Sequence, residues 1–266
     1  MDVEDWFHIC GVNDYLPRNG WPELESRVHE NTQRILYILD RAGIRATFFI
    51  LGFVAERDPG LVEKISRAGH EIATHGYAHR RVYTMTPDLF RQDLKKSVDT
   101  LSGITGNAVI GVRAPEWSIR DDSLWALDIL QEQGFVYDSS MAPLPFIGNS
   151  KYPKSPWKHR LANGDMWEIP PLVGSTPVIN FPLGGGWGLR TFPYRLIRAS
   201  IKKINNQLDP AVIFLHPREF DPDCPSIKLP VLKRFVLNAG TENTEKRLGR
   251  LLEDFEFCPA NEFLKL

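Results

Sequence analysis

Two histidines four residues apart, His75 and His79, are the first side chains in this sequence whose spacing could do chemistry. On one helical or turn face, imidazoles at this spacing lie close enough to bind one metal ion, although unconnected surface histidines also show it. A catalytic zinc site needs a third protein ligand and an open position. The acidic cluster Asp2, Glu4 and Asp5 can supply that ligand as a carboxylate, or it can be a solvated acidic end. Interleaved apolar residues favour a strand with one buried face.

Three further polar residues, Arg113, Asp138 and His216, each follow directly after a predicted strand. Arg113 can hold a carboxylate in a bidentate pair and keep it ionised, or it can form an ordinary surface salt bridge. Asp138 can orient an imidazole by accepting its N–H, or it can cap a turn. His216 can act as a general acid near neutral pH, or it can be a buried structural histidine.

Short apolar strands alternate with helical stretches along most of the chain. We expect strands at residues 46–51, 71–74, 109–112, 135–137 and 211–215, and helices at 27–42, 61–68, 86–101, 121–133, 194–206 and 242–254. Residues 141–188 are rich in Pro, Gly and Trp and break this pattern, as long functional loops do. The alternation indicates a parallel α/β sheet, either doubly wound or closed as a barrel. In a barrel the carboxyl ends of the strands converge on one mouth, so His75, Arg113, Asp138 and His216 would meet there.

The composition is that of a globular protein. Of 266 residues, 42% are hydrophobic and 24% charged, which excludes a disordered chain. The 32 Lys plus Arg balance 33 Asp plus Glu, so no basic surface for nucleic acid is indicated. The longest apolar run, residues 46–55, is about half a membrane span, and no export leader precedes it, so we expect a cytoplasmic protein without a membrane span. Cys10, Cys224 and Cys258 form no C-x-x-C pair and are expected to be buried, reduced thiols.

In chain order these residues resemble the five motifs of the polysaccharide deacetylases, a carbohydrate esterase family. The matching segments are Glu4-Asp5, His75-x-x-x-His79, Arg113-Ala114-Pro115, Asp138-Ser139 and Leu215-His216. The resemblance runs from residue 2 to about residue 217 and looks closest to deacetylases of bacterial exopolysaccharide gene clusters. It implies a distorted (β/α) barrel of about seven parallel strands over residues 1–217, with residues 218–266 as an extension packed on the barrel. It also implies one divalent metal, with Zn²⁺ as the expected ion.

The resemblance also implies a role for each residue of the motifs. Asp5, His75 and His79 would be the metal ligands, and Glu4 would be the catalytic base. Arg113 would tether that base, and Asp138 would tune the acid His216. The family usually has two aspartates at the first motif, and here the first of the two is glutamate, so Asp2 is a possible substitute base or ligand.

The implied reaction is metal-assisted hydrolysis of N-acetyl groups on an amino-sugar polymer, with release of acetate. Trp117, Trp187 and Pro115 are expected to contact the glycan, because indole rings stack on sugars. Two other functions fit the same residues. One is hydrolysis of a cyclic or small-molecule amide at the same metal site, and the other is glycan binding by an inactive barrel.

Overall fold

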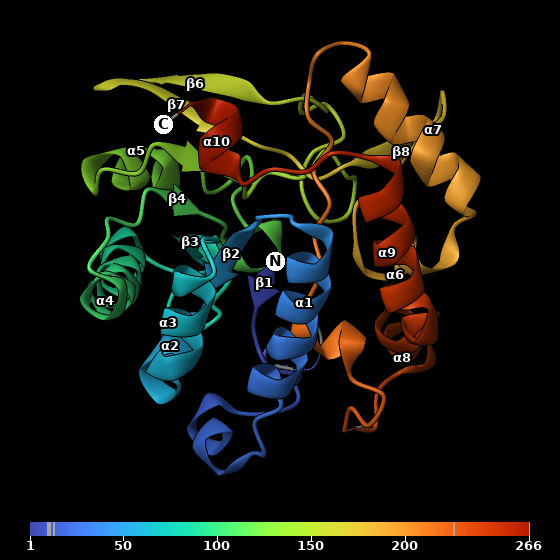
Figure 1. Cartoon of the computed structure of the whole chain (residues 1–266). Coiled ribbons are helices and arrows are strands. Elements are labelled where there is room, and N and C mark those ends of the chain that lie inside the picture. The colour runs from blue at the N-terminus through green and yellow to red at the C-terminus, as the bar shows by residue number, and fades with distance from the viewer. Residues whose placement is uncertain (10–11, 13, 226, 266) are drawn as a thin grey trace.

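Seven strands form one sheet at the centre of the described part of the chain (Figure 1). The structure, a computed structural model, describes all residues except 10–11, 13, 226 and 266. The strands of this sheet are β1 (Asp2–Val3), β2 (Thr47–Ile50), β3 (Glu71–Thr74), β4 (Gly111–Val112), β5 (Tyr137–Asp138), β7 (Gly164–Glu168) and β6 (Trp157–Leu161), in their spatial order. All neighbours pair in parallel except β6, which is antiparallel to β7. The expected seven parallel strands are therefore six parallel strands and one antiparallel edge strand.

Helices surround this sheet and connect its strands (Figure 1). They are α1 (Val28–Ala42), α2 (Gly52–Arg57), α3 (Pro59–Arg67), α4 (Pro87–Thr105), α5 (Trp125–Glu132), α6 (Gly186–Thr191), α7 (Tyr194–Asn205), α8 (Val231–Asn238), α9 (Thr244–Asp254) and α10 (Ala260–Leu264). Short 3-10 turns are η1 (Arg18–Glu23), η2 (Val82–Thr84), η3 (Pro115–Trp117), η4 (Pro217–Phe220) and η5 (Thr241–Asn243). The amphipathic faces of the helices pack on the sheet, as α1 does through Ile35 and Leu39.

Residues 211–215, which we expected to be a strand, run beside β1 and link the two edges of the fold. The N–H of Asp2 donates to the carbonyl of Leu215 at 2.9 Å, and the N–H of Leu172 donates to the carbonyl of Val212 at 3.0 Å. These hydrogen bonds close the sheet into a distorted (β/α) barrel, although residues 211–215 do not form a regular strand. The expected α/β class is confirmed, and the strand ends do converge on one mouth.

The region 141–188 contains more regular structure than its composition indicates. It holds the β6–β7 hairpin at the sheet edge and a separate two-stranded sheet of β8 (Val173–Ser175) and β9 (Asn180–Pro182). The β6 side chains alternate between half-buried and exposed, which is the period-2 pattern of an edge strand. This alternation was the signal for a strand, and the high Pro and Gly content masked it.

Residues 218–266 pack against the barrel at both of its ends. Arg27 at the start of α1 forms an ion pair with Asp221 at 2.5 Å. At the other end, the N–H of Ala260 donates to Oγ1 of Thr47 at 2.8 Å. These contacts join residues 218–266 closely to the barrel. The boundary between barrel and extension at residue 217 therefore stays a prediction.

The cysteines differ in part from the expectation. Cys224 is half-buried and Cys258 is exposed, and both are free thiols, whereas Cys10 lies outside the described residues. Within the described ranges, no helix has the length and hydropathy needed to cross a membrane.

Candidate metal centre and active site

Glu4, His75 and His79 form a buried group of possible metal ligands at the carboxyl ends of β1 and β3. Their ligand atoms all lie within 4.8 Å of one another, and among the described residues they alone form such a group. Each side chain is at most 3% exposed. Two imidazoles and one carboxylate are the donor set of many catalytic zinc sites.

His75 is held in the form that a metal requires. Its Nδ1 lies 2.7 Å from the carbonyl oxygen of Arg113, which can only accept a hydrogen bond. The proton therefore sits on Nδ1, and Nε2 keeps its lone pair for an ion. Burial lowers the pKa of His75 to about 4, so the ring is neutral at pH 7.

Glu4 provides the test of whether the residues fit a metal. Its buried Oε2 lies 2.6 Å from Nε2 of His79. Burial would raise the pKa of Glu4, but the interactions with His79, and then with His216 and His75, together outweigh burial and lower the pKa to about 2. An ionised carboxylate and two imidazoles gathered in one buried space are the donor set of a divalent metal ion. These residues therefore fit a divalent ion.

The backbone of the loop that carries the two histidines is strained, and a side chain of helix α4 holds this loop in place. His79 has a φ of 47°, a left-handed conformation that residues other than glycine rarely adopt. Asp93 on α4 accepts hydrogen bonds from the N–H groups of Tyr77 at 2.7 Å and Ala78 at 3.3 Å. Such strain persists only when surrounding contacts over-determine it, and Asp93 supplies two of them.

The expectation for Asp5 as a metal ligand is wrong in this structure. Its carboxylate accepts hydrogen bonds from the hydroxyl of Ser26 at 2.6 Å and from the N–H groups of Arg27 and Val28 at the start of α1. Asp5 therefore caps a helix, and Glu4 takes the place beside the histidines. Residues two apart on a strand share a face, so Asp2 and Glu4 point into the barrel together, whereas Asp5 turns away.

Arg113 binds the carboxylate of Asp2, whereas the family resemblance implies that Arg113 tethers Glu4. Its guanidinium lies 2.6 Å from Oδ1 of Asp2, and both side chains are at most 3% exposed. The same guanidinium donates to the hydroxyl of Ser139 at 2.9 Å, which fixes its plane. Burial would raise the pKa of Asp2, but the charge of Arg113, together with His75, the N-terminal amine and His216, outweighs burial and keeps that pKa well below its usual range. Asp2 is therefore ionised and oriented toward the site.

Glu219, which the sequence analysis missed, makes the contact with His216 that was assigned to Asp138. Its Oε1 lies 2.7 Å from Nδ1 of His216, and Arg190 approaches its other oxygen at 3.3 Å. Burial would lower the pKa of His216, but the carboxylates of Glu219, Glu4 and Asp2 together outweigh burial, and the net pKa is raised above 6.5. Asp138 instead accepts a hydrogen bond from Ser140 and faces Glu168. The i, i+3 spacing of His216 and Glu219 across a Pro-initiated turn was the available signal.

The residues expected to bind substrate lie at different distances from this site. The Trp117 ring centroid is 5.6 Å from the Arg113 guanidinium carbon, and Trp117 also contacts Phe214. Pro115 is buried at the start of the same turn. Trp187 on α6 packs on Phe192.

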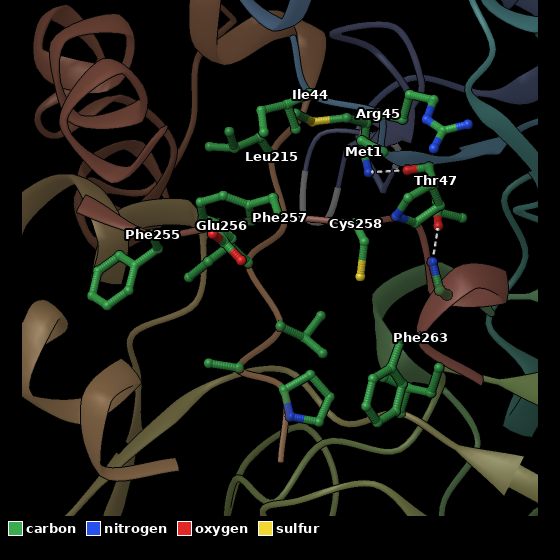
Figure 2. Close-up of a pocket in the computed structure, with 18 of the residues that line it drawn as sticks. Met1, Ile44, Arg45, Thr47, Leu215, Phe255, Glu256, Phe257, Cys258 and Phe263 are labelled. Atoms are coloured by element: carbon green, nitrogen blue, oxygen red, sulfur yellow. Dashed lines mark hydrogen bonds between the residues drawn. The ribbon is translucent and has the colours of Figure 1, made fainter. Parts of the chain in front are cut away.

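A separate cavity of about 200 Å³ lies at the amino end of β2 (Figure 2). Apolar side chains of the C-terminal segment, including Phe255, Phe257 and Phe263, line it (Figure 2). Neither Glu4, His75 nor His79 lines it, so it is not the metal centre. Arg113 is one of the residues that line it.

The comparison with known families agrees with this geometry. The sequence profile of the polysaccharide deacetylases matches residues 19–136. Residues 19–136 thus form a polysaccharide deacetylase domain. A second profile, a domain of unknown function named DUF3473, matches residues 139–265.

Relatives and solved structures extend the likeness. The chain is 36% identical over 111 residues to the peptidoglycan deacetylase-like protein FGM2 of Gibberella zeae, covering 41% of this chain and 32% of that protein. It is 34% identical over 108 residues to the peptidoglycan-N-acetylglucosamine deacetylase of Bacillus cereus, covering 40% of this chain and 38% of that protein. The matches thus span about a third of these relatives.

Two solved structures show the same fold. A probable polysaccharide deacetylase from Pseudomonas aeruginosa PAO1 superposes with a TM-score of 0.61 at 16% identity, covering 88% of this chain and 71% of that chain. Puue allantoinase superposes with a TM-score of 0.60 at 17% identity, with the same coverage of both chains.

Proposed function

We propose that this chain is a metal-dependent hydrolase that removes N-acetyl groups from an amino-sugar polymer and releases acetate. The observation that carries the proposal is the buried group Glu4, His75 and His79, with Asp2 and His216 beside it. The polysaccharide deacetylase domain at residues 19–136 and the names of the two curated relatives support the reaction type. An exopolysaccharide or a peptidoglycan-like glycan is the substrate class that we propose.

Glu4, His75 and His79 would hold one divalent ion, for which we propose Zn²⁺. When bound, such an ion polarises a carbonyl and lowers the pKa of a water molecule. His75 contributes a fixed, neutral imidazole, because its Nδ1 proton is engaged by the Arg113 carbonyl. Glu4 contributes the negative charge that imidazole ligands lack.

Asp2 is the carboxylate that we propose as the general base. Arg113 holds its Oδ1, while its Oδ2 lies 3.9 Å from Nε2 of His216. An ionised, fixed carboxylate can accept a proton from an attacking water without first losing one itself. This assignment replaces Glu4 as the base, because Glu4 faces the histidines.

His216 is the group that we propose as the general acid. Its Nε2 lies 3.6 Å from Oε1 of Glu4, and its side chain is 17% exposed, so it reaches the open side of the site. Glu219 stabilises the imidazolium form, which can donate a proton from Nε2 to the departing sugar amine. Proton uptake at Asp2 and proton release at His216 complete amide hydrolysis to acetate and a free amine.

Substrate contacts are proposed for Trp117, Pro115 and Trp187. Trp117 is the best placed of the three, because it lies beside Arg113 at the site. Indole faces stack on the apolar faces of sugar rings. The formal net charge of −1 gives the chain no excess of charge for a polyanion.

An acetate-release assay with metal analysis tests this proposal. Chitin oligomers, peptidoglycan fragments and poly-N-acetylglucosamine are offered to the wild-type chain, with and without a chelator. We expect acetate from at least one glycan and loss of release after chelation. His75→Ala and His79→Ala should lose metal and activity together, while His29→Ala, at a more exposed histidine on α1, should change neither. Full metal occupancy with no acetate from any glycan would overturn the proposal.

A further inference from the structure

Helix α8 presents a cluster of large apolar side chains to solvent. Val231 and Leu232 are each 74% exposed, and Phe235, one turn further along, is 53% exposed. Tyr15 extends this surface, since Nζ of Lys233 lies 5.2 Å from the centroid of its ring and Tyr15 is itself 48% exposed. Large apolar side chains gathered in one place on a surface mark a contact site.

The charges around this apolar face have one predominant sign. Residues 224–241 contain Lys228, Lys233 and Arg234 and no Asp or Glu. Lys228 and Arg234 are exposed. Asp223 and Glu242 flank this stretch, and Asp14 pairs with Lys233 at 3.5 Å. Among the described residues, Lys228 and Arg234 form no ion pair with any of these acids. The face is therefore apolar with a basic rim.

Buried arginines fix α8 in place by its carboxyl end. Arg190 donates to the carbonyls of Leu237 at 2.9 Å and Val236 at 2.7 Å, and Arg218 donates to the carbonyl of Leu237 at 2.7 Å. Cations at the negative end of a helix stabilise it. The exposed apolar face is thus a fixed surface of the folded chain.

The same arginines place α8 beside the candidate active site. Nε of Arg190 lies 3.3 Å from Oε2 of Glu219, the carboxylate that contacts His216. Arg218 belongs to η4, which follows His216, so its hydrogen bond to Leu237 joins α8 to this turn. Anything bound by α8 therefore lies near the mouth of the barrel.

We propose that α8 docks this chain on an anionic lipid bilayer, with the helix lying in the membrane interface. Leu and Phe side chains beside Lys and Arg are the pattern of interfacial helices, which need both apolar insertion and attraction to anionic lipids. A second copy of the chain is a poorer occupant, because a self-complementary contact would bury the cations of two basic rims in one interface. Such docking would hold the site close to a glycan carried at a membrane surface.

Vesicle co-sedimentation tests this surface independently of any acetate release. The full chain is mixed with vesicles of phosphatidylcholine alone, or of phosphatidylcholine with phosphatidylglycerol. We expect binding to the anionic vesicles and at least about a tenfold loss of affinity in Leu232→Ser/Phe235→Ser and in Lys228→Glu/Arg234→Glu. Leu208→Ser, at a side chain that is 92% exposed beyond α7, is the matched control and should bind as wild type.

The outcomes separate the possible occupants. Circular dichroism and sedimentation velocity on each variant report folding and oligomeric state. Binding that is equal on neutral and anionic vesicles, or unchanged in both double variants, would overturn the proposal. A wild-type dimer that ignores vesicles and dissociates in Leu232→Ser/Phe235→Ser would assign the face to self-association instead.

Discussion

The carboxylate of Glu219 lies 2.7 Å from Nδ1 of His216, three residues before it in the chain. This contact places a proton on Nδ1 and aims Nε2 at the space between Asp2 and Glu4. Arg190 and the 3-10 turn η4 hold the carboxylate in position. A local contact within one turn therefore orients the proposed acid.

Glu219→Gln should lower kcat without removing the metal. The amide cannot stabilise the imidazolium as a carboxylate does, so we expect about a 10- to 100-fold loss in kcat with little change in KM. Asp138→Asn, which alters the residue that the motif comparison assigned to His216, should leave the pH profile of kcat in place. Steady-state kinetics from pH 5 to 9 check both variants. An equal shift of the profile in the two variants would contradict the assignment.

Glu4→Gln and Asp5→Asn separate the two acids of the first motif. Glu4→Gln should weaken metal binding at least about tenfold, because a ligand charge is lost. Asp5→Asn should keep the metal and lower the free energy of unfolding by about 1 kcal/mol, since Asp5 caps α1. Metal stoichiometry and urea unfolding provide the two measurements. Loss of metal in Asp5→Asn, with the metal retained in Glu4→Gln, would instead assign Asp5 as the metal ligand, as the family resemblance implies.

Asp2→Asn should stop turnover while the metal remains bound. The amide keeps the shape of Asp2 and can still face Arg113, but it cannot take a proton from water. We expect kcat to fall about 10²- to 10⁴-fold, the range for loss of a general base. Metal analysis of the same preparation is the control. Turnover within a few-fold of wild type would exclude Asp2 as the base.

Glu168→Gln should stabilise the fold more at high pH than at low pH. Burial and the neighbouring Asp138 raise the pKa of Glu168 well above 4.5, and burial raises the pKa of Asp138 to about 6. A carboxyl with a raised pKa in the fold stabilises it fully below the unfolded pKa, and that stability is lost as pH rises toward the folded pKa. The loss is about 1.4 kcal/mol for each pH unit in that interval. Glutamine imitates the protonated acid and does not titrate.

Thermal unfolding at pH 5 and pH 8 measures this difference. The midpoint of Glu168→Gln minus that of wild type should be larger at pH 8. Glu63→Gln on α3, where the acid forms an exposed pair with Arg67, is the matched control and should show no such pH dependence. If the midpoint of Glu168→Gln minus that of wild type is smaller at pH 8 than at pH 5, Glu168 is ionised in the folded chain.

The repeating strands and helices, and the chemistry available at the strand ends, can be predicted from the amino-acid sequence alone. Apolar, β-branched runs bounded by glycine define β2 and β3, and hydrophobic periodicity defines α1 and α4. These are local properties, which short stretches of chain carry in full. His75 and His79 follow from them, because they come directly after β3.

The pairing of each acid with its partner depends on the three-dimensional arrangement of the barrel. Asp2, Glu4 and Asp5 are close in sequence, but the direction of each side chain depends on how β1 pairs with β2 and with residues 211–215. That register points Asp2 at Arg113 and Glu4 at His79, whereas the start of α1 captures Asp5. These partners lie 22 to 111 residues away along the chain. Their positions depend on the whole barrel closing, which no local pattern encodes.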